Sequence, residues 1–97
     1  MKKTKTSKYY ITSYHGDAFC IRFEVSRRAF LSQLRDNKDY AKIEEIEPNT
    51  EPNERGEYYN TEIMESDSTI ETRYIFGCGT SETRFEQIEA KEGYCFK

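Results

Sequence analysis

The chain has 97 residues, which is the size of one small folded domain. Charged residues make up 34% of it and aromatic residues 14%, and the formal net charge is −3. Its hydrophobic content of 35% is low for a globular protein, but the small net charge and the many aromatic residues argue against a disordered chain. No run approaches the roughly 18 apolar residues of a membrane-spanning helix, and the three cysteines have no paired spacing, so we expect a soluble cytoplasmic protein without a disulfide framework.

The first residues of the chain are basic and show no hydrophobic pattern. We expect residues 1–7 to form a flexible basic arm and residues 8–97 to form a single domain. Tyr9, Tyr10 and polar residues follow the arm where a signal peptide would continue with an apolar segment, so secretion is not expected.

Residues 8–25 predict a β-hairpin. Apolar residues alternate with polar ones over residues 19–25, which is the pattern of a half-buried strand. We expect a type II′ turn centred on Gly16 and the aspartate after it, because Gly16 tolerates the positive φ that this turn requires. This register creates one aromatic-rich face by pairing Tyr14 with Phe19, Thr12 with Ile21 and Tyr10 with Phe23.

Residues 26–37 predict a helix. Ser26 is a favourable N-cap residue, and Phe30, Leu31 and Leu34 form an apolar stripe. We expect the helix to end at Asp36-Asn37.

The segment after the predicted helix is less clear. Residues 40–47 fit either a strand or a continuation of the helix, and we favour the strand because alternation is present and Pro48 follows. Residues 48–56 are rich in proline, asparagine and acidic residues, which is typical of a loop.

A second hairpin is expected between residues 57–65 and 69–76, with two registers open. A two-residue loop at Asp67-Ser68 would pair Tyr59 with Phe76 and Glu62 with Arg73, whereas a three-residue loop would pair Tyr58 with Phe76 and Met64 with Ile70.

The C-terminal segment also has two interpretations, after a break at residues 77–80. It fits a helix capped by Ser81 and Gly93, or a hairpin of residues 83–90 against 94–97, and we favour the hairpin. The expected fold is therefore α+β: a β-hairpin, one helix and an antiparallel β-meander, with the single helix packed on one face of a mostly antiparallel sheet.

No catalytic or metal-binding pattern stands out. His15, Cys20, Cys78 and Cys95 lack the close pairs of a zinc site, so no metal, cofactor or catalytic residue is expected. Cys78 lies between two glycines, but nothing in the sequence places an activating base beside it.

Tyrosine pairs and charge are the features that suggest a role. In Tyr9-Tyr10 and Tyr58-Tyr59, one member of each pair should lie outside the core, because neighbours on a strand point to opposite faces. Residues 1–38 carry nine Lys/Arg against three acidic residues, and residues 39–97 carry six against fifteen. Such asymmetry is typical of an interaction surface.

Three functional hypotheses follow. The leading one is a small non-enzymatic inhibitor or regulator that binds a protein partner through a charged, tyrosine-rich surface, with its acidic face competing with nucleic acid for a basic partner. Its candidate residues are Glu44, Glu45, Glu47, Glu51, Glu54, Glu57, Glu62 and Glu65. The second is a nucleic-acid-binding accessory protein that uses Lys2, Lys3, Lys5, Lys8, Arg27, Arg28, Arg35 and Lys38. The third is a ligand-binding or catalytic subunit completed only on oligomerisation, for instance as a homodimer, because the edges of a short sheet favour pairing.

Overall fold

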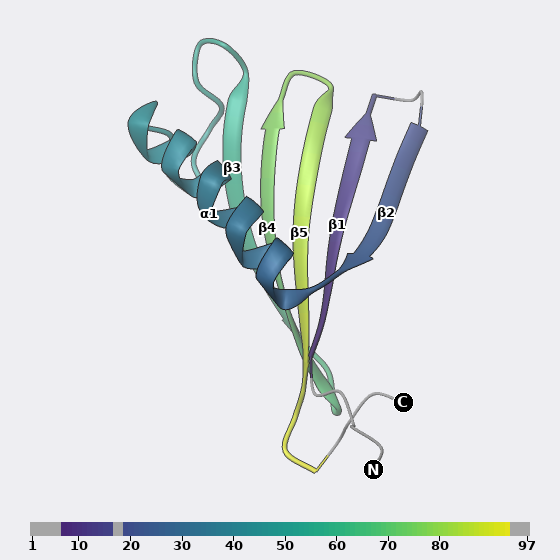
Figure 1. Ribbon diagram of the computed structural model, residues 1–97. Helices are drawn as coiled ribbons and strands as arrows, with labels where there is room; N and C mark the ends of the chain where they lie inside the picture. The colour runs from purple at the N-terminus through teal and green to yellow at the C-terminus, as the bar shows by residue number, and fades with distance from the viewer. Residues whose placement is uncertain (1–6, 17–18, 94–97) are drawn as a thin grey trace.

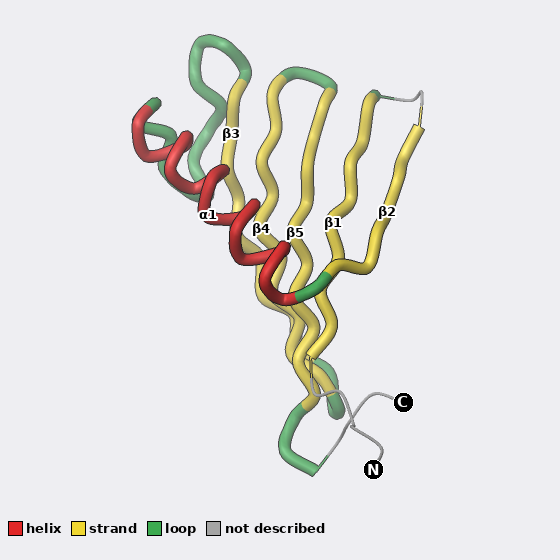
Figure 2. The backbone as a smooth tube through the Cα atoms, in the orientation of Figure 1, coloured by secondary structure: helices red, strands yellow, loops and turns green. Residues whose placement is uncertain are grey.

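The computed structural model describes residues 7–16 and 19–93 and shows the expected α+β fold of one helix and one antiparallel sheet (Figure 1). The elements are β1 (Ser7–His15), β2 (Phe19–Val25), α1 (Arg27–Ile43), β3 (Glu57–Glu65), β4 (Thr69–Cys78) and β5 (Ser81–Ala90). The strand order is β2-β1-β5-β4-β3, and α1 runs diagonally across one face of the sheet (Figure 2). No helix in the part of the chain that the structure describes is long and apolar enough to cross a membrane.

The last strand lies in the middle of the sheet. β5 pairs with β1 on one side and with β4 on the other, and so joins the N-terminal hairpin to the strands that follow α1. Residues 83–90 are therefore a strand, as favoured from the sequence, whereas the expected partner at 94–97 lies outside the described residues. The two-residue turn Gly79-Thr80 connects β4 to β5, and Gly79 has a φ of 61°.

The register predicted for the first hairpin is wrong by one residue. His15 pairs with Phe19 and Tyr14 with Cys20, so three residue positions separate the paired ends of β1 and β2. The backbone N–H of Gly16 donates to the carbonyl of Thr80 at 2.9 Å, which ties this end of β1 to the β4–β5 turn. Turn chemistry alone therefore does not set the pairing, because β1 must also align with β5.

The slip changes which residues share a face. Tyr10 and Tyr14 therefore lie on the face opposite to Ile21 and Phe23, since a shift of one residue moves every side chain to the other face.

The second hairpin has the register of the two-residue loop. Of the two registers left open, this one pairs Tyr59 with Phe76 and Glu62 with Arg73.

The helix starts as predicted and ends later. The Ser26 side chain accepts a hydrogen bond from the backbone N–H of Ala29 at 3.1 Å, which confirms the N-cap. The predicted end at Asn37 and the strand favoured for residues 40–47 are wrong, because the helix continues to Ile43. Asn37 donates to the Gln33 carbonyl within the helix instead of terminating it. The left-handed φ of 56° that ends the helical path occurs at Glu45.

The core lies between α1 and the sheet. Phe30 and Leu34 of α1 pack with Phe85 of β5, and Phe30 meets Phe85 edge to face. Ala41 continues the buried stripe, whereas Leu31, which we predicted to be a core residue, is 41% exposed. The partly buried side chains that surround this cluster are Tyr9, Ile11, Val25, Tyr74 and Phe76.

Candidate functional site

One face of the sheet has no described helix or strand over it. α1 covers the face that carries Tyr9 and Phe85, and Figure 2 shows no second layer behind the strands. We call the opposite face the open face. By the strand registers its side chains are those of Lys8, Tyr10, Thr12 and Tyr14; Cys20, Arg22 and Glu24; Tyr58, Asn60, Glu62 and Met64; Glu71, Arg73 and Ile75; and Glu82, Arg84, Glu86 and Ile88.

A nearly buried carboxylate lies at the centre of the open face. Thr12 is 2% exposed and Glu86 is 8% exposed, although no helix covers them. The Thr12 hydroxyl donates to Glu86 Oε1 at 3.1 Å. Arg22 Nη2 lies 3.5 Å from Glu86 Oε2, and Arg73 Nε lies 3.9 Å from the same oxygen. A carboxylate this far from solvent needs such partners, so the surrounding side chains form a fixed polar network.

Two arginines of the open face lie against tyrosine rings. The Arg22 guanidinium is 4.0 Å from the ring centroid of Tyr10, and that of Arg84 is 4.7 Å from the ring centroid of Tyr14. Arg84 Nε also donates to Glu82 at 2.6 Å. Each guanidinium is thus held by a carboxylate and an aromatic face together, which reduces its freedom before any ligand binds.

Tyr58 extends the network across three strands. Its side chain starts on β3, passes over Gly77 of β4 and donates its hydroxyl proton to Glu82 of β5 at 2.8 Å. Burial of the phenol and then the hydrogen bond to Glu82 raise the pKa of Tyr58 to about 12. The phenol therefore stays protonated at neutral pH.

The open face is hollowed and nearly neutral. A shallow depression of about 400 Å³ is lined by Thr12, Tyr14, Cys20, Arg22, Glu71, Arg73, Arg84 and Glu86. The face as a whole carries the cations Lys8, Arg22, Arg73 and Arg84 and the anions Glu24, Glu62, Glu71, Glu82 and Glu86. Alternating donors and acceptors suit a ligand that itself carries both charges, and they do not suit a polyanion.

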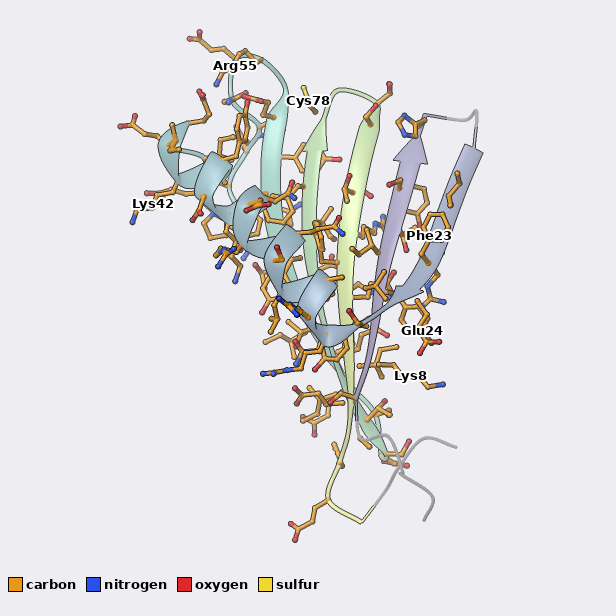
Figure 3. All side chains as sticks on the ribbon, viewed as in Figure 1. Lys8, Phe23, Glu24, Lys42, Arg55 and Cys78 are labelled. Carbon is orange, nitrogen blue, oxygen red and sulfur yellow. The ribbon has the colours of Figure 1, made fainter. Side chains whose placement is uncertain are left out.

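The predicted acidic residues do not form one face. Six of them lie in residues 44–57, the segment that connects α1 to the start of β3. We call this segment the acidic connection, and Arg55 is its one cation (Figure 3). Arg55 Nη2 pairs with Glu44 at 2.7 Å and with Glu57 at 2.9 Å. Glu62 projects from the open face, and Glu65 lies at the far end of β3, paired with Lys91 at 2.7 Å.

Glu57 is the most tightly held carboxylate of the acidic connection. Its Oε2 accepts the Tyr40 hydroxyl proton at 2.6 Å, and its Oε1 accepts from the Asn53 amide at 3.1 Å. The Tyr40 hydrogen bond is the main reason that the pKa of Glu57 is lowered, and the same bond raises the pKa of Tyr40. Four of the six acidic residues remain exposed to solvent: Glu45, Glu47, Glu51 and Glu54.

The predicted basic residues are divided between two surfaces. Lys2, Lys3 and Lys5 lie outside the described residues, and Lys8 belongs to the open face. The remaining four, Arg27, Arg28, Arg35 and Lys38, are exposed residues of α1. Lys38 Nζ lies 4.4 Å from the Tyr74 ring centroid. The four helix cations therefore lie on the other side of the sheet from Lys8.

Cys20, Cys78 and His15 occupy the two faces of the sheet, whereas Cys95 lies outside the described residues. Cys20 lies on the open face, whereas Cys78 and His15 lie on the helix side, in one row with Ser81 of β5 between them. The sequence showed no such proximity, because it depends on β5 lying between β1 and β4. Within residues 7–16 and 19–93, no three His, Cys, Asp or Glu side chains are arranged to hold a metal ion.

A second, smaller cleft of about 220 Å³ lies between the C-terminal half of α1 and strands β3 to β5. Its lining includes Tyr40, Glu57, the Tyr59–Phe76 ring stack and Cys78, whose thiol lies 3.8 Å from the Arg55 carbonyl. No protein-family model matches the chain, and neither the curated proteins nor the solved structures contain a significant match.

Proposed function

We propose that this protein is a non-enzymatic binding module that engages a protein partner through the open face of its sheet. The observation that carries the proposal is the arrangement of Arg22 on Tyr10 and of Arg84 on Tyr14 around the nearly buried Glu86. Tyrosine and arginine are enriched in protein interfaces and dominate their binding energy. Because these side chains are already held by ion pairs and ring contacts, binding costs less conformational entropy.

The charge balance of the open face favours a protein over a nucleic acid. Counterion release requires a surplus of cations facing the phosphates, and this face carries one more anion than cations. A protein surface with its own mixture of arginine and carboxylate groups provides the matching pattern.

The charge of the acidic connection indicates which kind of protein partner this module would bind. Its four exposed glutamates, Glu45, Glu47, Glu51 and Glu54, give this part of the surface a surplus of negative charge, because Arg55 is the one cation of the acidic connection. Such a patch would steer the protein toward a basic surface and would compete there with nucleic acid, as an inhibitor or regulator does. This finer role depends on the partner being basic.

The test compares two tyrosines that lie on opposite sides of the sheet. Tyr14→Ala removes a ring of the open face, and Tyr40→Ala removes a ring on α1 that belongs to the other side of the sheet. In affinity capture from a lysate of the native host, a partner retained by the parent protein and by Tyr40→Ala should be lost with Tyr14→Ala. In titration with that purified partner, Tyr14→Ala should weaken binding by about tenfold or more.

Two outcomes would count against the proposal. Equal loss of the partner with both tyrosine variants would show that the open face is not the contact. Binding of labelled single-stranded nucleic acid with a steep loss of affinity as salt rises would favour the nucleic-acid alternative instead. Replacing the four exposed glutamates of the acidic connection with lysine tests the finer role, since it should lower the association rate for a basic partner most strongly at low salt.

A further inference from the structure

The sheet has two edges, and the residues that the structure describes cover only one of them. β3 forms one edge, and the acidic connection covers its first half. The N–H of Asn49 donates to the Tyr59 carbonyl at 2.8 Å, and the Asn49 side chain accepts from the N–H of Thr61 at 3.0 Å. Asn53 makes equivalent bonds to both backbone groups of Glu57. Natural sheets cover an edge in this way to prevent strand pairing.

β2 forms the other edge, and no described segment covers it. Its helix-side row carries Ile21, 41% exposed, and Phe23, 60% exposed. Its open-face row carries Cys20, Arg22 and Glu24, all exposed. Figure 3 shows Phe23 and Glu24 along this outer strand, away from the helix. An uncovered edge of seven residues with exposed apolar side chains is a template for an added strand.

The sequence of β2 is complementary to itself in an antiparallel register centred on Phe23. When two copies pair with Phe23 on the symmetry axis, Arg22 of each copy lies opposite Glu24 of the other, and Ile21 lies opposite Val25. Opposite charges and aromatic or β-branched residues placed in this way stabilise a sheet. Centring the pair on Arg22 or on Glu24 instead would place two like charges opposite each other on the axis, which is destabilising.

We infer that this protein forms a two-fold symmetric homodimer through antiparallel pairing of β2 with β2, centred on Phe23. The axis is perpendicular to the sheet, because residues opposite each other in an antiparallel ladder point to the same face. The two helices therefore lie on one side of a continuous sheet, and the two open faces form one extended surface on the other side. The inference does not depend on the proposed function, because it rests on the uncovered edge of β2 and on the residue order of that strand, although Arg22 takes part in both.

Site-specific disulfide formation tests both the dimer and its register. In a background with Cys20, Cys78 and Cys95 replaced by serine, Phe23→Cys places two thiols at the axis and should form a disulfide-linked dimer under mild oxidation. Ile21→Cys is the matched control, because the two residues 21 would be separated by four residue spacings along the strands, about 13 Å. It should remain monomeric on non-reducing gels.

Sedimentation of the unmodified chain gives the independent measurement. The parent protein should sediment as a dimer, and Arg22→Glu or Glu24→Arg alone should weaken the dimer by about tenfold. The double variant Arg22→Glu/Glu24→Arg should restore it, with circular dichroism verifying the fold of each variant. A parent protein that stays monomeric at millimolar concentration would overturn the inference. So would faster cross-linking of Ile21→Cys than of Phe23→Cys, or a double variant as weak as the singles.

Discussion

Gly77 allows a sharp test of how the open face is built. A methyl group added at Gly77 would lie 2.5 Å from Tyr58 Cε1 and closer still to the end of the ring. Gly77→Ala must therefore displace Tyr58 from its path across β4. The displaced phenol loses its 2.8 Å hydrogen bond to Glu82, an interaction worth about 1.5–3 kcal/mol when the acceptor is charged.

The preference of a strand for alanine over glycine opposes this loss of stability. Alanine in place of glycine stabilises a strand by roughly 0.5–1 kcal/mol, and Gly77 has no positive φ that would oppose the change. The net expectation for Gly77→Ala is a loss of about 1–2 kcal/mol in the free energy of unfolding. For a chain of this size that corresponds to a melting temperature lower by roughly 5–15 °C.

A double-mutant cycle isolates the cause. In a Tyr58→Ala background the obstruction is absent, so Gly77→Ala should stabilise the protein by about 0.5 kcal/mol, and the sign of its effect reverses. Urea unfolding followed by circular dichroism measures all four proteins. If Gly77→Ala changes the stability by the same amount in both backgrounds, Tyr58 does not depend on the glycine and the reasoning is refuted.

Three further predictions concern stability. Folding raises the pKa of Tyr58 from 10.0 to about 12, so the stabilising contribution of Tyr58 is complete below pH 10 and is lost as the pH rises toward 12. Urea midpoints measured over a pH series should show this decline in stability, and Tyr58→Phe should make the decline smaller. Thr12→Val keeps the shape of the side chain but removes the hydrogen bond to the nearly buried Glu86, so it should lower the free energy of unfolding by about 1–3 kcal/mol in chemical denaturation. Unchanged stability of this variant would contradict the polar network around Glu86. Ser26→Ala removes the helix N-cap and should cost about 1 kcal/mol in thermal unfolding, with Ser26→Gly closer to the parent protein.

Local patterns predicted much of the fold. The strand predicted from period-two alternation over residues 19–25, the N-cap at Ser26 and the burial of Phe30 and Leu34 follow from neighbouring residues, and the structure confirms each of them. The tyrosine pairs also behaved as predicted, because adjacent strand residues must point to opposite faces. Tyr9 packs on Phe30, whereas Tyr10 lies under Arg22 on the open face.

The helix end shows how tertiary contacts override a local signal. Asp36-Asn37 resembles a termination signal, yet Ala41 lies about two helical turns beyond Leu34 along the same buried stripe as Phe30 and Leu34. Burial against the sheet favours continuing the helix beyond a residue that is merely tolerated at a helix end. The sequence predicted the apolar stripe over Phe30 and Leu34, but an alanine at position 41 is too weakly hydrophobic to indicate that the stripe and the helix continue.

Strand partners and the candidate site depended on the tertiary structure. Nothing local to Glu86 indicates that it meets Thr12 and Arg22, because β5 becomes a neighbour of the first hairpin only when it enters the middle of the sheet. That arrangement also set the register of the first hairpin and so decided which face received Tyr14. Periodicity along a chain determines which residues can share a face, whereas the choice of partner strands depends on burial and hydrogen bonding between distant segments.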